Sequence, residues 1–80
     1  MKIGIIGLGF VGLSFAVVLG SKGYQVIGID KNKHHLDLLQ QGKSSFFEKD
    51  LEKLLKIGIK NKIKFSSSIS ELKICDLIFV

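Results

Sequence analysis

The feature that most constrains this chain is a glycine-rich turn directly behind an apolar run near the N-terminus. Residues 3–6 read IGII and residues 7–12 read GLGFVG. An unbroken apolar block bounded by glycine is typical of a strand buried on both faces, as in parallel sheets. The apolar stretch that follows predicts a helix from about Phe10 to Ser21, with Gly20 and Gly23 as stop signals.

The three glycines of this turn, Gly7, Gly9 and Gly12, have the spacing G-x-G-x-x-G. In such a turn the first glycine permits the tight bend and the second lets a pyrophosphate approach the backbone. The third lets the helix lie close to the strand. The helix N-terminus also points unpaired amide groups and its positive dipole end at that phosphate.

A second apolar run, residues 24–29, predicts another strand, and it ends on Asp30, 18 residues after Gly12. An acid about 20 residues beyond the glycines is placed to reach the ribose hydroxyls of a dinucleotide. The glycine pattern alone is weak evidence, but here a strand precedes it, a helix follows it and an acid ends the next strand. A carboxylate at position 30 favours NAD over NADP because it would repel a 2′-phosphate, although Lys31 and Lys33 act in the opposite direction.

The rest of the chain continues the alternation of helices and strands. The expected elements are a helix capped by Asn32 and closed by Gly42, a loop at 44–47 anchored by Phe46 and Phe47, a helix over 48–56 broken by Gly58, a strand at 63–65, a capping box at 68–71 that opens a short helix, and a buried strand at 76–80. This order predicts an α/β fold: a partial Rossmann fold, with a parallel sheet of about four strands in the order 3-2-1-4 and flanking helices.

The last expected strand would lie beside the first, where a complete Rossmann fold has a further strand next to it. The sequence stops there, at Val80. We therefore expect residues 1–80 to be the N-terminal part of a dinucleotide-binding domain, with no second domain and with an exposed sheet edge that would allow self-association.

Composition narrows the range of partners. The net charge of +5 comes from 12 lysines without any arginine, and nucleic-acid readers usually add arginine forks or stacked aromatic rings, so we expect no nucleic-acid binding. The single cysteine, Cys75, fits a reducing, cytoplasmic compartment and is expected to be a packed core thiol. Residues 3–20 lack charge, but their glycines and the lack of a cleavage site argue against a signal peptide or membrane span.

His34 and His35 are adjacent, so on a helix their side chains point about 100° apart and cannot share a metal as an i,i+4 pair can. We expect no metal site. On spacing alone, two half-exposed polar residues are the simpler interpretation, and contact of one histidine with a ligand is the alternative.

Four blocks of the sequence resemble the N-terminal NAD-binding region of the UDP-glucose/GDP-mannose dehydrogenase family. They are KIGIIGLGFVGL, VIGID, LLQQGKSSFFEKDLEKLL and KIKFSSSISELKICDLIFV, and the similarity covers essentially all 80 residues. Many dehydrogenases share the first block, whereas the third is more discriminating and argues against the 6-phosphogluconate and 3-hydroxyacyl-CoA types.

The resemblance implies that NAD is contacted by the turn from Gly7 to Gly12, including Phe10 and Val11, by Asp30 at the ribose, and by position 35. The family tends to have lysine or arginine at that last position, where this chain has His35, which can still donate to a ribose hydroxyl. Residues 45–51 also lack the two prolines and the glycine of the family pattern.

Family members oxidise the C6 hydroxyl of a nucleotide sugar to a carboxylate, and their catalytic cysteine, lysine and acid would lie beyond Val80. Cys75 matches none of them, so we expect no catalytic residue here. We expect a fragment that binds NAD weakly, catalyses nothing alone and meets a nucleotide sugar only when the missing part is supplied. The alternative is a free-standing nucleotide-binding or regulatory module that pairs its sheet edge with a partner chain.

Overall fold

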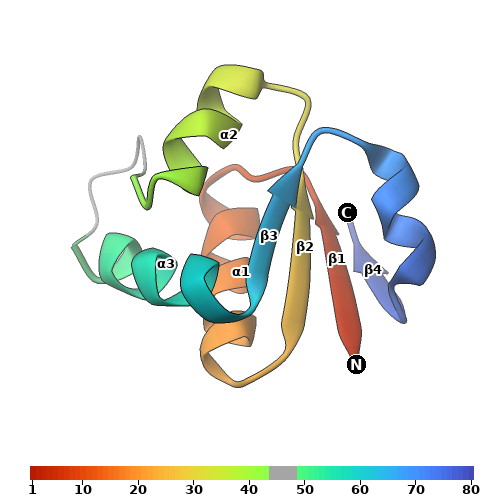
Figure 1. The fold of residues 1–80 in the computed structure, drawn as a ribbon, viewed down its shortest axis with the longest axis horizontal. Helices are drawn as coiled ribbons and strands as arrows, with labels where there is room; N and C mark the ends of the chain where they lie inside the picture. The colour runs from red at the N-terminus through yellow and green to blue at the C-terminus, as the bar shows by residue number, and fades with distance from the viewer. Residues whose placement is uncertain (44–48) are drawn as a thin grey trace.

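The sheet at the centre of the chain has four parallel strands in the order β3-β2-β1-β4 (Figure 1). It is seen in a computed structural model that describes residues 1–43 and 49–80. The elements are β1 (Lys2–Ile6), α1 (Phe10–Ser21), β2 (Gln25–Ile29), α2 (Lys33–Gln40), α3 (Lys49–Asn61), β3 (Ile63–Ser66), the 3₁₀ helix η1 (Ile69–Ile74) and β4 (Leu77–Phe79). The predicted α/β class, the parallel sheet and its strand order are confirmed, while the loop expected at 44–47 lies outside the described residues.

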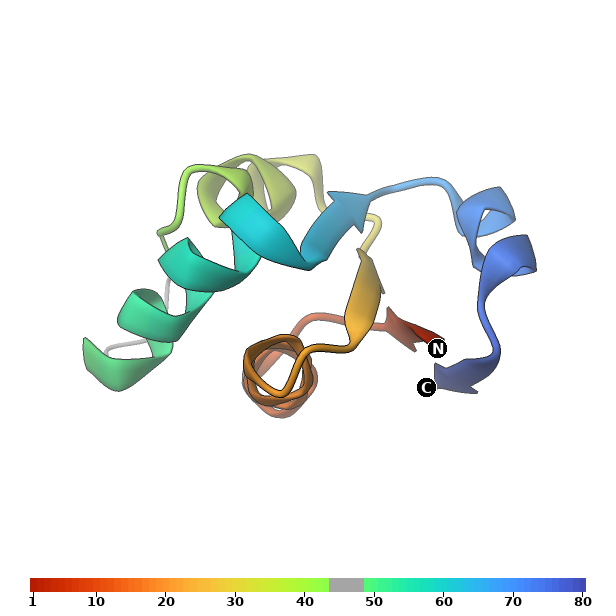
Figure 2. The same cartoon turned by 60° about the horizontal axis from the view of Figure 1, so that its bottom comes forward.

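Two apolar clusters hold helices to the two faces of the sheet. In the larger cluster, Ile3 and Ile5 of β1 pack with buried residues of α1, α2 and α3. In the smaller one, Ile27 and Ile29 of β2 pack against Leu72 of η1. Figure 2 shows the resulting layers, with α1 and α3 to one side of the strands and η1 to the other. The alternation of side chains along each strand produces this division, because neighbouring residues point to opposite faces.

The start and end of α2 follow the predicted signals. Asn32 is its N-cap, and the side-chain oxygen of Asn32 accepts a hydrogen bond from the amide of His35 at 3.0 Å. Gly42 follows the helix with a φ of 79°, a left-handed conformation that suits a glycine beyond a helix end. Both predictions are confirmed, and the cap fixes the backbone of His35 in the first turn of α2.

The prediction that Gly58 breaks the third helix is wrong, because α3 continues to Asn61. Gly58 is buried, and a Cβ at this position would overlap the Cδ1 atom of Ile63. The glycine therefore serves close packing between α3 and the start of β3 rather than helix termination.

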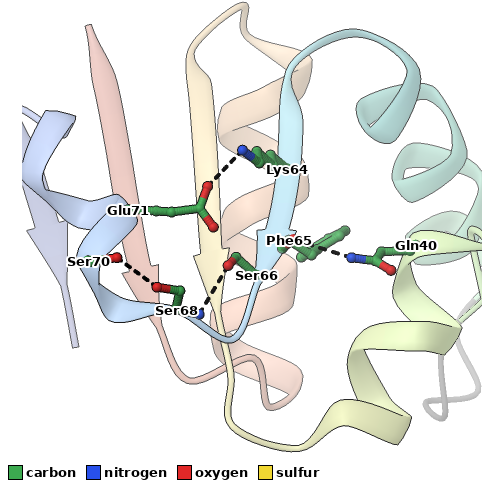
Figure 3. Close-up of polar contacts among 7 residues, drawn as sticks. All are labelled: Gln40, Lys64, Phe65, Ser66, Ser68, Ser70 and Glu71. Carbon is green, nitrogen blue, oxygen red and sulfur yellow. Dashed lines mark hydrogen bonds and ion pairs between the residues drawn. The ribbon is translucent and has the colours of Figure 1, made fainter.

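The capping box expected at 68–71 does not form. Residues 69–74 are a 3₁₀ helix, and Ser68 makes no side-chain cap to it. The Ser68 hydroxyl is instead 2.7 Å from that of Ser70, and the Glu71 carboxylate pairs with Lys64 of β3 at 2.7 Å (Figure 3). The hydrogen bond from Lys64, with a second from Ser66, holds the pKa of Glu71 below its ordinary value. Glu71 thus pairs with Lys64 of β3 and does not form the local capping box with Ser68.

The prediction that the last strand is buried is also wrong. Side chains of β4 are exposed: Leu77 by 46%, Ile78 by 48% and Phe79 by 41%. Strand β4 pairs with β1 on one side, and among the described residues no strand pairs with its other side. The opposite edge of the sheet differs, because the Gln40 side chain of α2 donates to the Phe65 carbonyl of β3 at 3.3 Å (Figure 3).

Cys75 is a free thiol at the end of η1, partly buried against Ile27, Ile29 and Leu72. Burial raises its pKa, the charge of Asp76 raises it further, and Lys2 partly offsets both. Because the thiolate is the reactive form, we expect iodoacetamide at pH 8 to alkylate Cys75 several times more slowly in the folded chain than in urea. Mass spectrometry of timed samples would check this, and equal rates would contradict the packed position.

Candidate functional site

The glycine turn lies at the carboxyl ends of β1 and β2. Gly7 has a φ of 91°, which strongly favours glycine, and its amide donates to the Ile29 carbonyl of β2 at 2.8 Å. Gly12 lies so close beneath the turn that a Cβ there would overlap the Gly7 carbonyl oxygen. The first and third glycines thus have the steric roles predicted for them.

Gly9 stands at the N-terminus of α1 and leaves that end open. It is the N-cap residue, with an extended backbone and no side chain to cap the helix. A Cβ on Gly9 would have no neighbour within 4 Å, and no acidic residue occupies the first turn. Val11 is 80% exposed in the same turn. The helix therefore presents its positive dipole end, with backbone amides, to an approaching anion.

Asp30 is brought directly against the turn. Its Oδ2 accepts a hydrogen bond from the Leu8 amide at 2.9 Å, and its Oδ1 accepts one from the Asn32 amide at 3.0 Å. A carboxylate offers about four acceptor positions, so these two bonds leave capacity for further donors such as ribose hydroxyls.

The charge of Asp30 is stabilised by the same contacts. Burial acts to raise its pKa, but hydrogen bonds from the amides of Asn32 and Leu8, with the electrostatic influence of His35, lower the pKa of Asp30 below its ordinary value of 3.8. The carboxylate is therefore ionised at neutral pH, the state in which it accepts hydrogen bonds most strongly.

His35 reaches the same turn from α2. Its Nε2 lies 2.6 Å from the Leu8 carbonyl oxygen. A carbonyl only accepts hydrogen bonds, so Nε2 carries the proton and donates it. Sequence reasoning missed both this contact and the role of Leu8, whose amide is bound by Asp30. The leucine side chain does not indicate these hydrogen bonds, because they are made by the backbone amide and carbonyl of Leu8.

Hollows lie on both sides of the glycine turn. A cleft of about 380 Å³ on one side is lined by Gly9, Asp30, Asn32, His34 and His35, among others. A hollow of about 300 Å³ on the other side lies between β1, α1 and β4 and is mainly apolar, with Val11, Phe15 and Phe79 on its walls. This arrangement suits a ligand with two halves joined at a phosphate group.

The predicted cofactor residues therefore gather in one place, with Phe10 and Val11 in the first turn of α1 between the glycines. Among residues 1–43 and 49–80, no group of three or more potential metal-ligating side chains lies together. None of the described helices is long and apolar enough to cross a bilayer.

The fold and the glycine turn with its acid define a dinucleotide-binding domain of the Rossmann type. The model of the UDP-glucose/GDP-mannose dehydrogenase family, NAD binding domain, matches residues 1–80. The chain therefore belongs to this family, and its cofactor is NAD. The resemblance seen in the sequence is confirmed, and the other dehydrogenase types are set aside.

Three proteins to which this chain is similar are all much longer than it. GDP-mannose 6-dehydrogenase of Pseudomonas putida is 48% identical over 61 residues, which are 76% of this chain and 14% of that enzyme. An uncharacterized protein of Methanocaldococcus jannaschii is 38% identical over 80 residues, and the chain spans 9% of its length. The crystal structure of a GDP-mannose dehydrogenase ternary complex from Pseudomonas aeruginosa superposes with a TM-score of 0.92 at 36% identity, covering 100% of this chain and 19% of that one.

Proposed function

We propose that residues 1–80 form the N-terminal part of the NAD-binding domain of a nucleotide-sugar 6-dehydrogenase and bind NAD across the glycine turn. The observation that carries this proposal is the position of the ionised Asp30 carboxylate, bonded to the Leu8 amide beside the open N-terminus of α1. The Asp30 carboxylate then faces the ribose, and the N-terminus of α1 faces the pyrophosphate.

The pyrophosphate would lie in front of Gly9, Phe10, Val11 and Gly12, where no side chain blocks the backbone at Gly9. The adenosine ribose would lie in the cleft that Asp30 and His35 line. The nicotinamide half would then occupy the apolar hollow beside Val11 and Phe79.

Catalysis would need residues that this chain does not supply. The chain spans 9% to 16% of the length of its curated relatives, and the catalytic groups implied by the family lie beyond position 80. We propose that the 80 residues bind NAD, in the cytoplasm, without oxidising a nucleotide sugar, and that the sugar is bound only together with the rest of such an enzyme.

The exposed strand β4 favours a second candidate, a module that pairs its sheet edge with another copy of this chain. Backbone groups at an open edge can accept another strand, and the side chains of β4 are apolar. The β3 edge is less suited, because Gln40 already bonds to it.

Isothermal titration calorimetry with NAD tests the first proposal, together with an assay of NADH formation from GDP-mannose or UDP-glucose. We expect saturable NAD binding and no NADH. Lack of binding at millimolar NAD would overturn the binding proposal, and NADH formation by the 80-residue chain would overturn the proposal that it is inactive alone.

Light scattering decides the second candidate: a dimer that Phe79→Lys and Ile78→Lys convert to monomer supports it, and a wild-type monomer contradicts it.

A further inference from the structure

We infer that His35 is a positioning residue, which fixes the peptide between Leu8 and Gly9 so that the Gly9 amide faces the pyrophosphate of NAD. This inference rests on the proposed function and assigns His35 a task other than direct contact with the ribose. It begins from the two hydrogen bonds that meet at Leu8, one from its amide to Asp30 and one to its carbonyl from His35.

These two bonds fix two consecutive peptide planes. Asp30 holds the plane between Gly7 and Leu8 through the Leu8 N–H, at 2.9 Å. His35 holds the plane between Leu8 and Gly9 through the Leu8 C=O, at 2.6 Å. The Leu8 side chain is fully buried, so the residue between the two planes is also anchored in the core. Leu8 therefore has little freedom to rotate while both contacts persist.

The direction of the Gly9 amide follows from peptide geometry. In a trans peptide the C=O of one residue and the N–H of the next point to opposite sides of the chain. Because the Leu8 oxygen faces His35 on α2, the Gly9 N–H points away from α2. This amide donates to no other described residue, which leaves it available to an anion at the start of α1.

Without His35, the backbone itself would not prevent this plane from turning over. Glycine accepts positive φ values as readily as negative ones, so Gly9 could follow a rotation of the peptide. The turned plane would direct the Leu8 carbonyl, with its partial negative charge, towards the phosphate and withdraw the amide. The bond from His35 disfavours that alternative.

The backbone that carries the imidazole is itself held in place. The amide of His35 donates to the side chain of its N-cap Asn32 at 3.0 Å, which fixes the first turn of α2. A donor near the Nε2 position is what the contact needs, and a glutamine side chain can place an N–H group there. His35→Gln is thus the conservative variant, and His35→Met removes the donor by putting an apolar side chain of similar length in its place.

The test compares three ligands by NMR titration: NAD, ADP and adenosine. We expect His35→Met to weaken NAD and ADP about tenfold, the size of one lost hydrogen bond, and adenosine less than twofold, because adenosine lacks the pyrophosphate. We expect His35→Gln to bind all three ligands within threefold of the wild type. Equal losses for adenosine and ADP would show direct ribose contact and overturn the inference, as would an unchanged NAD affinity in His35→Met.

Gln40→Met is the matched control, since it removes another hydrogen bond from an α2 side chain to a backbone carbonyl, that of Phe65. We expect it to bind NAD and ADP as the wild type does, and a loss equal to that of His35→Met would contradict a specific role for His35.

If the wild type binds no NAD, the proposed function fails, and the unliganded chain still decides the inference. In the NMR spectrum of the unliganded chain, we expect His35→Met to shift or broaden the Gly9 amide resonance, and His35→Gln and Gln40→Met to leave it unchanged. An unmoved Gly9 resonance in His35→Met would overturn the inference that His35 positions this peptide.

Discussion

Replacing Gly12 with alanine is expected to abolish the folded state or to cost on the order of 3 kcal/mol of unfolding free energy, the upper range for overpacking. The added methyl group would overlap the Gly7 carbonyl oxygen, which is backbone rather than the end of a flexible side chain. Gly7 cannot move away easily, because its amide is bonded to Ile29 of β2 at 2.8 Å. Urea unfolding followed by far-UV circular dichroism would measure the change.

Gly9→Ala is the matched control for this prediction. A methyl group there meets no atom within 4 Å, and the backbone of Gly9, with a φ of −66°, is one that alanine adopts. We expect the stability of Gly9→Ala to equal or exceed that of the wild type by up to about 1 kcal/mol. NAD binding should nevertheless weaken about tenfold or more, because the methyl group occupies the path of the pyrophosphate. Wild-type stability in Gly12→Ala, or wild-type NAD affinity in Gly9→Ala, would contradict the steric roles assigned to the two glycines.

Those parts of the fold that depend on local signals could be predicted from the sequence. The glycine turn, the Asn32 cap and the apolar runs each contain their own evidence within a few residues. Their order restricts the sheet to right-handed parallel crossovers, and the glycine turn with its acid then selects the Rossmann arrangement 3-2-1-4 among the doubly wound sheets. This is why Asp30 could be placed at the turn without any structural information.

The errors arose where a distant residue competes with a local signal. A glycine is a common helix stop, but Gly58 lies inside α3, where the lack of a side chain lets the helix pack closely against Ile63 of β3. Glu71 has the spacing of a capping box, but Lys64 on the neighbouring strand binds its carboxylate. The exposure of β4 depends on what lies beside that strand, which hydropathy does not encode.

The contact between His35 and Leu8 was missed for the same reason. The two residues are 27 positions apart, and the acceptor is a backbone carbonyl, a group that every residue carries. Residue type therefore gives no information about it. Sequence reasoning could identify which side chains gather at the site, but not which of them act on the backbone of the turn.

Asp30→Asn is expected to cause a large loss of NAD affinity, between about tenfold and a hundredfold, because charge-assisted hydrogen bonds contribute about 1.5–3 kcal/mol. The discrimination against NADP should fall at the same time, since the carboxylate no longer repels a 2′-phosphate. Calorimetric titrations with NAD and NADP would measure both changes. Asp37→Asn, which removes the same charge from an exposed position on α2, is the control and should leave the ratio of the two affinities unchanged.

The same substitution should also alter how stability depends on pH. The pKa of Asp30 in the folded chain is below 3.8, so its stabilising contribution is fully present above the unfolded value and is lost as the pH falls through the folded one. The wild type should therefore lose stability between about pH 4 and the lower folded pKa more steeply than Asp30→Asn, as measured by urea midpoints at successive pH values. Parallel pH profiles for the two proteins, with unchanged NAD affinity, would mean that the carboxylate neither anchors the turn nor faces the ribose.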